Sequence, residues 1–334
     1  MSGPRSSSSI PRWARALVLC VVALAATAFA QAPSRVARVG YLTISPRASQ
    51  AHLIAAFERG LAERGYTVGR DLVIEYRFAD GEIERLQALA DDLVRAGVDV
   101  IVTGVNPNIR AAQRATRTIP IVAANAYLPV EEKLVESLSR PGGNVTGLTT
   151  DAAEEIGRRL QVLKEAVPGV RRVAAFYGTG EAYAMRAIEN LSRHGRTIGV
   201  AIVPIEVRGA QDVERAFAEA KRAKADALIG FGAITLTLRA TIIRHANQAR
   251  LPTVFTDRQY VDDGALMSYG VDLSDLFRRA AGYVDRILKG ARPGDLPMEQ
   301  PSRYVLAINL RTARMLGITV PPSLMLQADY TVDR

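Results

Sequence analysis

The residue types that carry most enzyme chemistry are sparse in this chain. Its three histidines, His52, His194 and His245, are scattered, without a second histidine at metal-binding spacing. Each falls on an expected helix beside charged or polar residues, so we interpret all three as solvated. The single cysteine, Cys20, lies in an N-terminal leader that we expect to be removed. Zinc and thiol chemistry are therefore not expected, and no metal or cofactor is predicted.

Glycine-rich turns of the kind that bind phosphate are incomplete. Gly178-Thr179-Gly180 follows an expected strand, but Tyr183 stands where the third glycine of a dinucleotide loop belongs. Gly230-Phe231-Gly232 has the same defect, with Thr235 in the final position. There is no Walker loop, Ser268 lacks a nucleophile elbow, and no close carboxylate pair suggests a general acid and base. The pattern favours binding over catalysis.

Alternating strands and helices must position the polar residues that remain. Short apolar segments rich in β-branched residues predict buried parallel strands at 36–42, 72–76, 100–104 and 119–123. Amphipathic segments between them predict helices at 49–64, 83–96 and 106–115. Gly65 and Gly97 follow two of these helices, as glycine often does at helix C-termini. This alternation implies right-handed crossovers and a parallel sheet.

The same series occurs twice along the chain. VGYLT (39–43) matches VAAFY (173–177), DVIV (99–102) matches DALI (226–229), and IPIVAAN (119–125) matches LPTVFTD (251–257). The second copy predicts strands at 173–177, 201–205, 227–230 and 253–255, with helices at 182–196, 211–223 and 236–249. An extra strand (265–269) and helix (273–289) follow, then a tail strand (304–309) and a short helix (310–316). We expect an α/β protein with two doubly wound parallel-sheet lobes around a cleft, although any two such series look alike.

Three turn-rich segments, at 140–144, 262–264 and 290–294, lie at the ends of the two copies. Each alone is typical of a surface loop. Their placement together predicts three crossings between the lobes, which would form a hinge that permits closure. We therefore expect lobe I to comprise 36–146 plus 264–291, and lobe II to comprise 147–263 plus 292–334.

Polar and aromatic residues follow the strands of both copies, where ligands of open α/β sheets bind. In the first copy these positions hold Tyr41, Thr43, Ser45, Gly104, Asn106, Asn125 and Tyr127. In the second copy they hold Tyr177, Thr179, Gly232, Thr235, Asp257 and Tyr269. This set of hydroxyls, amides, aromatic rings and one carboxylate suits a small polar or zwitterionic molecule with a flat or apolar part.

Asp257 is the sharpest of these candidates, because an amino group would need a carboxylate at the mouth of the cleft. Arg258 beside it either pairs with Asp257 at the surface or meets a substrate carboxylate. The tyrosines have an alternative role in covering sheet edges. Asn106 and Asn125 have one as loop or helix-capping residues, since asparagine is favoured at helix starts.

The first thirty residues are typical of a cleavable export signal. Three arginines precede a short apolar core at 17–26, and Ala28-Phe29-Ala30 forms an A-x-A cleavage site, so Gln31 would become the N-terminus in the periplasm. The alternatives are an uncleaved anchor, for which the core is short, and lipidation at Cys20, which follows a leucine instead of a small residue. Removal of the signal lowers the formal charge from +9 to +6. The remaining basic residues are interspersed with acidic ones, without a nucleic-acid-binding stripe or motif.

A series of short motifs runs in order along the mature chain. They are RVGYLT (38–43), SRPGGNVTG (139–147), GALMSYG (264–270), ILKGA (287–291) to LP (296–297), INL (308–310), LGI (316–318) and PPSL (321–324). Together they resemble the ABC-transporter substrate-binding family with the type 1 periplasmic fold, some members of which recognise aromatic amino acids. The chain departs from the family pattern at YLPV (127–130) and GFGA (230–233). Both departures fall at the proposed cleft, so the identity of the ligand is not carried over.

Three functions remain open from the sequence. The resemblance implies a soluble receptor that presents a solute, such as an amino acid, to a permease in the inner membrane powered by a separate ATPase. A periplasmic sensory receptor would use the same cleft but signal to a membrane kinase, and a secreted enzyme would need catalytic groups that converge only in the fold. We expect the first, with ligand shifting an open population to a closed one. Neither catalysis, nucleic-acid binding nor stable membrane insertion is expected.

Overall fold

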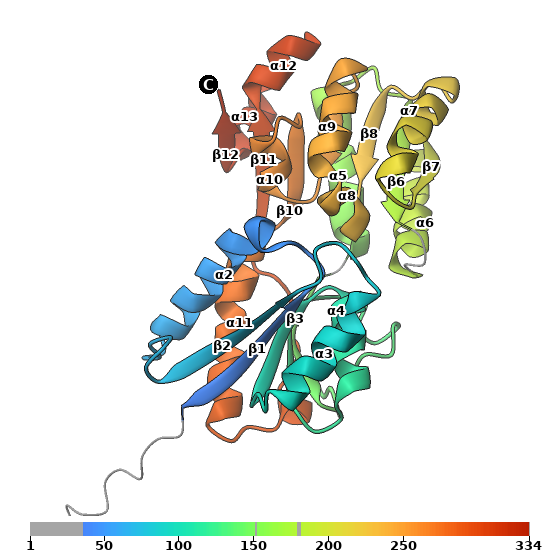
Figure 1. The fold of residues 1–334 in the computed structure, drawn as a ribbon. Coiled ribbons are helices and arrows are strands. Elements are labelled where there is room, and N and C mark those ends of the chain that lie inside the picture. Colours follow the sequence, from blue (N-terminus) through green and yellow to red (C-terminus); the bar gives the residue numbers. More distant parts are fainter. Residues whose placement is uncertain (1–35, 151, 179–181, 334) are drawn as a thin grey trace, which may run out of the picture. The chain divides into compact units, whose positions relative to one another are not determined.

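A computed structural model describes residues 36–150, 152–178 and 182–333 of the chain. The expected signal at 1–30, including Cys20, and the expected ligand residue Thr179 lie outside the described residues. The described part forms two mostly parallel sheets with helices on both faces of each (Figure 1). None of its helices has the length and apolar character needed to cross a membrane.

The first sheet has parallel strands in the order β2-β1-β3-β4-β5. They are β1 (Ala37–Thr43), β2 (Leu72–Phe78), β3 (Val100–Gly104), β4 (Ile121–Tyr127) and β5 (Val145–Thr150). Helices α3 (Arg85–Arg95) and α4 (Asn106–Ala115) cover one face, and α2 (Arg47–Ala62) and α11 (Leu273–Leu288) cover the other. Successive strand residues point to opposite faces, so Tyr41 packs on the side of α2 and α11 while Leu42 packs on the side of α3 and α4.

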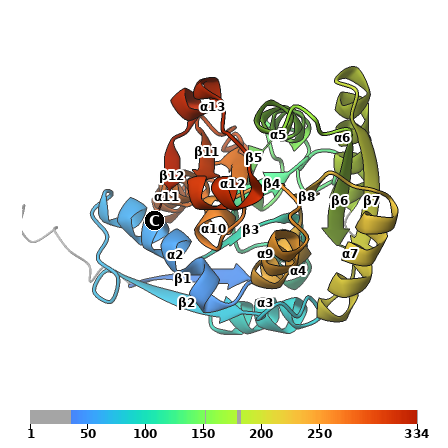
Figure 2. The same cartoon turned by 90° about the horizontal axis from the view of Figure 1, so that it is seen from above.

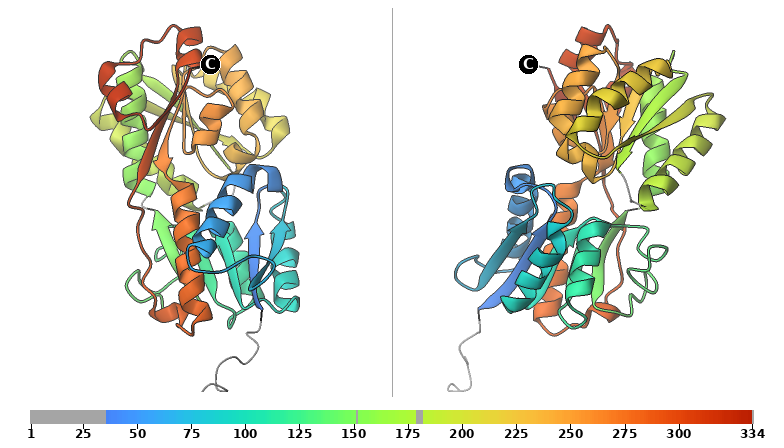
Figure 3. Two further views of the ribbon diagram at one scale, coloured as in Figure 1. Left: turned by 90° about the vertical axis from the view of Figure 1, so that its left-hand side faces the viewer. Right: turned by 45° about the vertical axis from the view of Figure 1, so that its right-hand side comes forward.

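Helices α2 and α11 lie side by side although they come from opposite ends of the chain (Figure 3). The Tyr66 hydroxyl donates to Asp285 Oδ1 at 3.0 Å across 219 positions of sequence. A Cβ atom at Gly60 would lie 2.2 Å from the carbonyl oxygen of Arg278. Only glycine permits this close approach. The first lobe is thus completed by a helix that follows much of the second lobe in the sequence.

The second sheet has the order β12-β11-β10-β9-β8-β6-β7, in which only the β10–β11 pair is antiparallel. Its strands are β6 (Arg172–Gly178), β7 (Ala201–Val207), β8 (Ala227–Gly230), β9 (Thr253–Phe255), β10 (Met267–Val271), β11 (Tyr304–Asn309) and β12 (Tyr330–Val332). Helices α5 (Ala152–Ala166), α6 (Ala182–Thr197), α12 (Leu310–Leu316) and α13 (Pro322–Gln327) pack on one face, and α7 (Val213–Arg222), α9 (Arg239–Gln248) and α10 (Arg258–Asp262) on the other. Figure 2 shows β12 and β7 at opposite edges of this sheet.

The strand order of the first sheet is repeated in the second as β7-β6-β8-β9-β10. This confirms the two-lobe α/β fold expected from the doubled sequence. Several elements coincide with their expected ranges, namely β3, β8, β9, β11, α4 and α12, and the others that were expected lie within a few residues of theirs. The expected helix at 236–249 is divided into α8 (Ala233–Thr237) and α9, because Leu238 between them has φ −98° and ψ 13°. A 3-10 turn (Ala210–Asp212) precedes α7.

Five elements were not expected from the sequence, namely β5, α5, α10, α13 and β12. The strand expected as an addition at 265–269 is β10, which is the fifth strand of the second sheet. It pairs with β9 in parallel and is the counterpart of β5 in the first sheet. The repeat therefore contains five strands in each copy, not four and an extra one.

The chain crosses between the lobes three times, but at other places than expected. It leaves the first sheet after β5 at Thr150, returns at Asp272 between β10 and α11, and leaves again between Glu299 and β11. The turns at 140–144 and 262–264 instead connect elements within one lobe. The turn at 290–294 stays with the first lobe, where Gly142 N donates to the Gly294 carbonyl at 3.1 Å.

Strand pairing therefore differs from the expected lobe boundaries at 146 and 264. Strand β5 pairs with β4, which keeps 145–150 in the first lobe. Strand β10 pairs with β9 and β11, which places 267–271 in the second. Met298 is buried in the core beneath α3 and α4, so the chain reaches the second lobe only after it.

Candidate functional site

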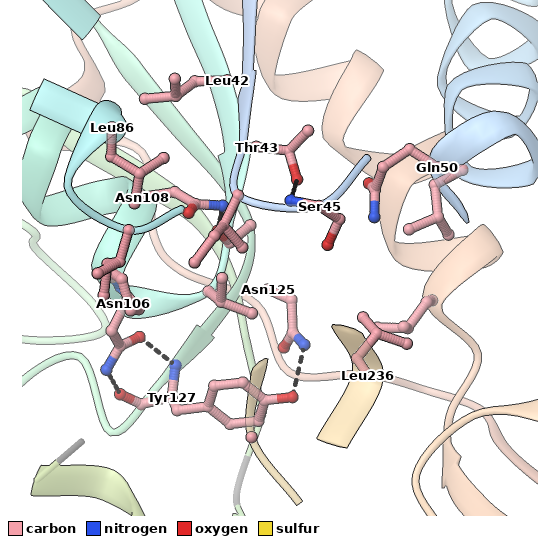
Figure 4. Close-up of a pocket in the computed structure, with 18 of the residues that line it drawn as sticks. Leu42, Thr43, Ser45, Gln50, Leu86, Asn106, Asn108, Asn125, Tyr127 and Leu236 are labelled. Carbon is pink, nitrogen blue, oxygen red and sulfur yellow. Dashed lines mark hydrogen bonds between the residues drawn. The ribbon is translucent and has the colours of Figure 1, made fainter. Parts of the chain in front are cut away.

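A cavity of about 430 Å³ lies where the carboxyl ends of the first sheet face residues of the second lobe (Figure 4). Its first-lobe wall comes from the ends of β1, β3 and β4, from the start of α4, and from residues of α2, α3 and α11. Its second-lobe wall comes from α8, α10 and the residues before them. The volume is within the range of about 300–1,000 Å³ that is usual for small-molecule sites.

Most of the expected ligand residues line this cavity. From the first lobe these are Tyr41, Thr43, Ser45, Gly104, Asn106, Asn125 and Tyr127, and from the second they are Gly232 and Asp257. The rule that ligands bind beyond the carboxyl ends of parallel strands thus brings together residues from distant parts of the sequence.

Three other expected residues that the structure describes do not line the cavity. Thr235 is buried, and its hydroxyl donates to the Gly232 carbonyl at 3.0 Å. Tyr269 stacks on Tyr304 with ring centroids 5.9 Å apart. Tyr177 is partly buried and packs against the core beneath α5 and α6. These three side chains of the second lobe therefore serve packing and local hydrogen bonding.

Tyr41 orients the side-chain amide of Gln50, a lining residue that was not expected from the sequence. The buried Tyr41 hydroxyl donates to Gln50 Oε1 at 3.0 Å, and burial raises the pKa of Tyr41 far above its ordinary value. The phenol therefore remains a neutral hydrogen-bond donor. Because it occupies Oε1 of Gln50, the other end of that amide, Nε2, points away from it and has no partner among the described residues. Figure 4 shows this amide nitrogen and the Ser45 hydroxyl on the same side of the cavity. Together they provide two neutral hydrogen-bond donors.

Asn106 and Asn125 hold Tyr127 in the cavity wall. Asn106 Nδ2 donates to the Tyr127 carbonyl at 2.7 Å, and Tyr127 N donates to Asn106 Oδ1 at 2.9 Å. Asn125 Nδ2 donates to the Tyr127 hydroxyl at 3.0 Å, while Asn125 Oδ1 accepts from Thr150 Oγ1 at 2.7 Å. Both amides are thus used in fixing the loop, which agrees with the alternative role considered for them.

The turn that begins α4 carries two unusual features. Val105, at the N-cap of α4, has φ 54° and ψ 147°, a conformation that is strained for a β-branched residue. Asn108, in the first turn, is buried, and its Nδ2 donates to the Gly104 carbonyl at 2.7 Å. Its Oδ1 accepts no hydrogen bond from any described residue. Both residues line the cavity.

Asp257 begins α10 on the opposite wall. Its side chain caps the helix by accepting from Gln259 N at 2.8 Å. Burial raises the pKa of Asp257 above its ordinary value, and this effect is opposed by the bond from Gln259 and by the charges of His52 and Arg258. Arg258 itself is exposed, pairs with Asp262 at 3.3 Å and lies over the ring of Tyr330. The surface pair with Asp257 considered for Arg258 is therefore not formed, and Arg258 is not among the residues that line the cavity.

His52 is not the solvated side chain that the sequence suggested. It is partly buried on α2, and its ring nitrogens lie 3.0 and 3.1 Å from Gln259 Nε2. Burial lowers the pKa of His52 below its ordinary value, and the negative charge of Asp257 partly opposes this shift. A neutral ring can accept a hydrogen bond from the glutamine amide N–H, so this contact joins the two walls of the cleft.

Among its described residues, the cavity wall has three other charged groups. Arg110 pairs with Glu132 at 2.5 Å, whereas Arg114 donates to the neutral Gln87 Oε1 at 2.7 Å. Asp257 forms no ion pair with a described Lys or Arg residue within 4.0 Å. No group of three or more histidine, cysteine, aspartate or glutamate residues in the described part could hold a metal ion. The site therefore combines hydrogen-bonding groups and apolar side chains with one lining carboxylate, Asp257, that has no such ion pair.

Sequence reasoning missed several lining residues, namely Gln50, Asn108, Gln259 and Phe277. One signal was available for Gln50, because it lies at helical spacing from Leu53, Ile54 and Phe57 on the buried face of α2. A polar residue on an otherwise apolar helix face needs a polar partner. The same reasoning could have paired Gln50 with Tyr41 before the fold was known.

Comparison with known proteins agrees with this architecture. The chain matches the family model for ABC transporter substrate binding proteins over residues 44–332. A tyrosine-binding protein from Clostridioides difficile (strain R20291) is 26% identical over 263 residues, which are 78% of this chain and 75% of that protein.

Two solved structures resemble the whole described fold. A conserved domain protein from Vibrio cholerae O1 biovar eltor has a TM-score of 0.83 and 30% identity, covering 89% of this chain and 100% of that one. The ABC domain in complex with L-Trp from Streptococcus pneumonia has a TM-score of 0.81 and 24% identity, covering 89% of this chain and 99% of that one. The chain therefore belongs to the ABC transporter substrate-binding protein family and has the type 1 periplasmic binding fold.

Proposed function

We propose that the protein is the extracytoplasmic solute-binding component of an ABC importer and that it captures an aromatic amino acid in the inter-lobe cleft. The observation that carries this proposal is the make-up of the cavity wall. Asp257, a lining carboxylate that forms no ion pair with a described Lys or Arg residue, shares the cavity with neutral hydrogen-bond donors and a largely apolar lining. An aromatic amino acid has matching parts, namely an ammonium group, a carboxylate and a flat apolar ring.

Each part of such a ligand has a counterpart in the cleft. Asp257 binds the ammonium group, because a charged hydrogen bond there satisfies a carboxylate that lacks a cation. Ser45 and Gln50 donate to the ligand carboxylate from the first lobe. The ring occupies the apolar part of the cavity, where Leu42 and Leu86 lie. The names of the relatives support this assignment, since one is a tyrosine-binding protein and another was solved with L-Trp.

The proposal includes export, closure and delivery. The signal at 1–30 directs the chain to the periplasm and is removed there, without lipidation at Cys20. The ligand bridges Asp257 on one wall and first-lobe donors on the other, so it stabilises the closed arrangement of the lobes. The closed protein then docks on a permease in the inner membrane. The ligand leaves unchanged, because the protein does not catalyse its conversion.

The direct test is to identify what the purified protein binds. Mass spectrometry of small molecules released on denaturation should detect tyrosine, tryptophan or phenylalanine, and calorimetry with the L-amino acids should show saturable binding of at least one of them. Small-angle scattering at saturating ligand should show a smaller radius of gyration. Binding of no amino acid would overturn the proposal, and loss of ligand mass after incubation would overturn the exclusion of catalysis.

A further inference from the structure

Among the described residues of the cavity wall, Asn108 has the only buried side-chain acceptor that is left without a donor. Its side chain is 1% exposed. The orientation of its amide is fixed, because Nδ2 donates to the Gly104 carbonyl at 2.7 Å. The opposite atom, Oδ1, is therefore held as an acceptor. A buried acceptor without a donor costs free energy that a suitable ligand group can recover.

Two other asparagines line the cavity, and neither has a side-chain oxygen without a hydrogen-bond donor. Asn106 uses both side-chain atoms on the backbone of Tyr127. Asn125 uses Oδ1 on Thr150 and Nδ2 on the Tyr127 hydroxyl. Asn108 alone keeps one position of its amide free, and this position can only accept a hydrogen bond.

The surroundings of Asn108 indicate which part of a ligand would reach it. Figure 4 shows Asn108 beside Leu42 and Leu86, across the cavity from Gln50 and Leu236. Leu42 and Leu86 are buried in the core beneath α3 and α4. In the proposed function the ammonium and carboxylate groups of the amino acid bind Asp257 and Gln50, which lie near α2, since Gln259 contacts His52 there. The ring end of the ligand is therefore the part directed at Asn108.

We infer that Asn108 selects aromatic amino acids whose ring carries a hydrogen-bond donor, such as a phenol O–H or an indole N–H, over phenylalanine. This inference rests on the proposed function. A ring donor satisfies Oδ1, whereas phenylalanine leaves it buried and unpaired. Sites that hydrogen-bond a substrate hydroxyl reject the analogue that lacks it strongly, for the same reason. The oxygen is covered in this structure, so a ring that reaches it must shift the apolar side chains around it.

Calorimetry with four ligands tests the inference on the unaltered protein. L-Tyrosine, L-tryptophan, L-phenylalanine and O-methyl-L-tyrosine are titrated in turn; the last keeps the ring oxygen but has no hydrogen to donate. We expect tyrosine or tryptophan to bind at least ten-fold more tightly than phenylalanine and O-methyl-L-tyrosine. Equal affinity for all four would overturn the inference while leaving the proposed function intact. Absence of binding by all of them would instead overturn the proposed function.

An Asn108→Leu variant separates selection from folding. The substitution removes the acceptor at similar size, so the ratio of tyrosine to phenylalanine affinity should fall at least ten-fold even where both affinities change. The matched control is Asn247→Leu, because Asn247 Nδ2 also donates to a glycine carbonyl, that of Gly264 at 3.1 Å, but lies outside the cavity. The control should keep the ratio of the unaltered protein. A folded Asn108→Leu variant with an unchanged ratio would contradict the role of Asn108.

Discussion

The two lobes share the same order over five strands, but they differ in the polar groups that they bury. Helix α11 packs beside α2 in the first lobe, as α5 packs beside α6 in the second. The buried face of α11 is largely apolar, with Phe277, Ala281 and Val284. The corresponding part of α5 buries an ion pair between Arg159 and Glu155. The two lobes thus share an arrangement of strands and helices, whereas the charged groups buried within them differ.

The strand ends differ in the same way. Asn125 and Asp257 occupy matching positions in the doubled sequence, but only Asp257 carries a charge. Before α4 the first lobe has Val105 at φ 54°, and before α8 the second has Gly232 at φ 89°. A duplicated framework can therefore present different chemistry to each side of one ligand. Each difference can be removed by substitution, which tests what it contributes.

The largest expected effect follows from breaking the buried ion pair of the second lobe. In Arg159→Met, Glu155 keeps its charge in a buried site without its guanidinium partner, so we expect a loss of about 3–5 kcal/mol in the free energy of unfolding. Urea denaturation measures this loss. The exposed pair of Arg292 and Asp295 provides the control, since Arg292→Met should change stability by no more than about 1 kcal/mol. Equal effects of the two substitutions would mean that Arg159 is not a structural cation.

The next largest expected effect is on ligand affinity, when the charge that distinguishes Asp257 from Asn125 is removed. Asp257→Asn keeps an oxygen that can cap α10, so folding should be preserved. Loss of the charged hydrogen bond to the ligand ammonium should weaken binding by about 1.5–3 kcal/mol, which is ten-fold or more. Calorimetry with the best-binding amino acid measures the change. Unchanged affinity would remove Asp257 from the ligand site.

The pH dependence of binding should report the same carboxylate. Because burial raises the pKa of Asp257, affinity should fall as the pH decreases towards this raised pKa, which lies above the ordinary value of 3.8. In the absence of ligand the sign is reversed for stability, since ionisation of Asp257 opposes folding as the pH rises through the same range. Burial lowers the pKa of His52, so His52→Gln is measured in parallel. A decline in affinity that persists in Asp257→Asn but vanishes in His52→Gln would assign it to the histidine.

The smallest expected effects on stability come from substituting Val105, which precedes α4, and Gly232, which precedes α8. Gly232→Ala forces a side chain into a glycine conformation and should cost about 1–3 kcal/mol of stability. Val105→Gly should instead raise stability by about 0.5–1 kcal/mol, because the strain released exceeds the freedom that glycine gains in the unfolded chain. Denaturation midpoints of the two variants should therefore move in opposite directions. A destabilised Val105→Gly would show that the packing of the valine side chain outweighs its strain.

Much of the architecture could be predicted because it depends on local patterns. Apolar strands, amphipathic helices and their repetition give the sheets, and the strand-end rule then places residues as distant as Tyr41 and Asp257 in one cavity. Strand β5 was missed because VTGLTT resembles a polar loop. Its threonines are buried, and their hydroxyls form hydrogen bonds with residues that are distant in the sequence. For example, Thr146 Oγ1 donates to the Leu296 carbonyl at 2.7 Å. No local pattern reveals such a partner.

The remaining errors have a similar cause. The crossings were placed at turn-rich segments, but turn residues mark any reversal of the chain, whether within a lobe or between lobes. The actual crossing at Asp272 joins a strand to a helix without a glycine or proline at that position. The free oxygen of Asn108 depends on how its amide is oriented by Gly104, which only the folded backbone determines.

The position of α11 sets the order in which the protein can fold. Helix α11 supplies much of the core beneath β1 and α2, including Phe277, Ala280 and Val284. A chain synthesised from its N-terminus therefore cannot complete its first lobe until residue 288 of 334 has been added. Contacts between such distant segments also form slowly. The N-terminal lobe is consequently finished late, after β6 to β10 of the second lobe have already been synthesised.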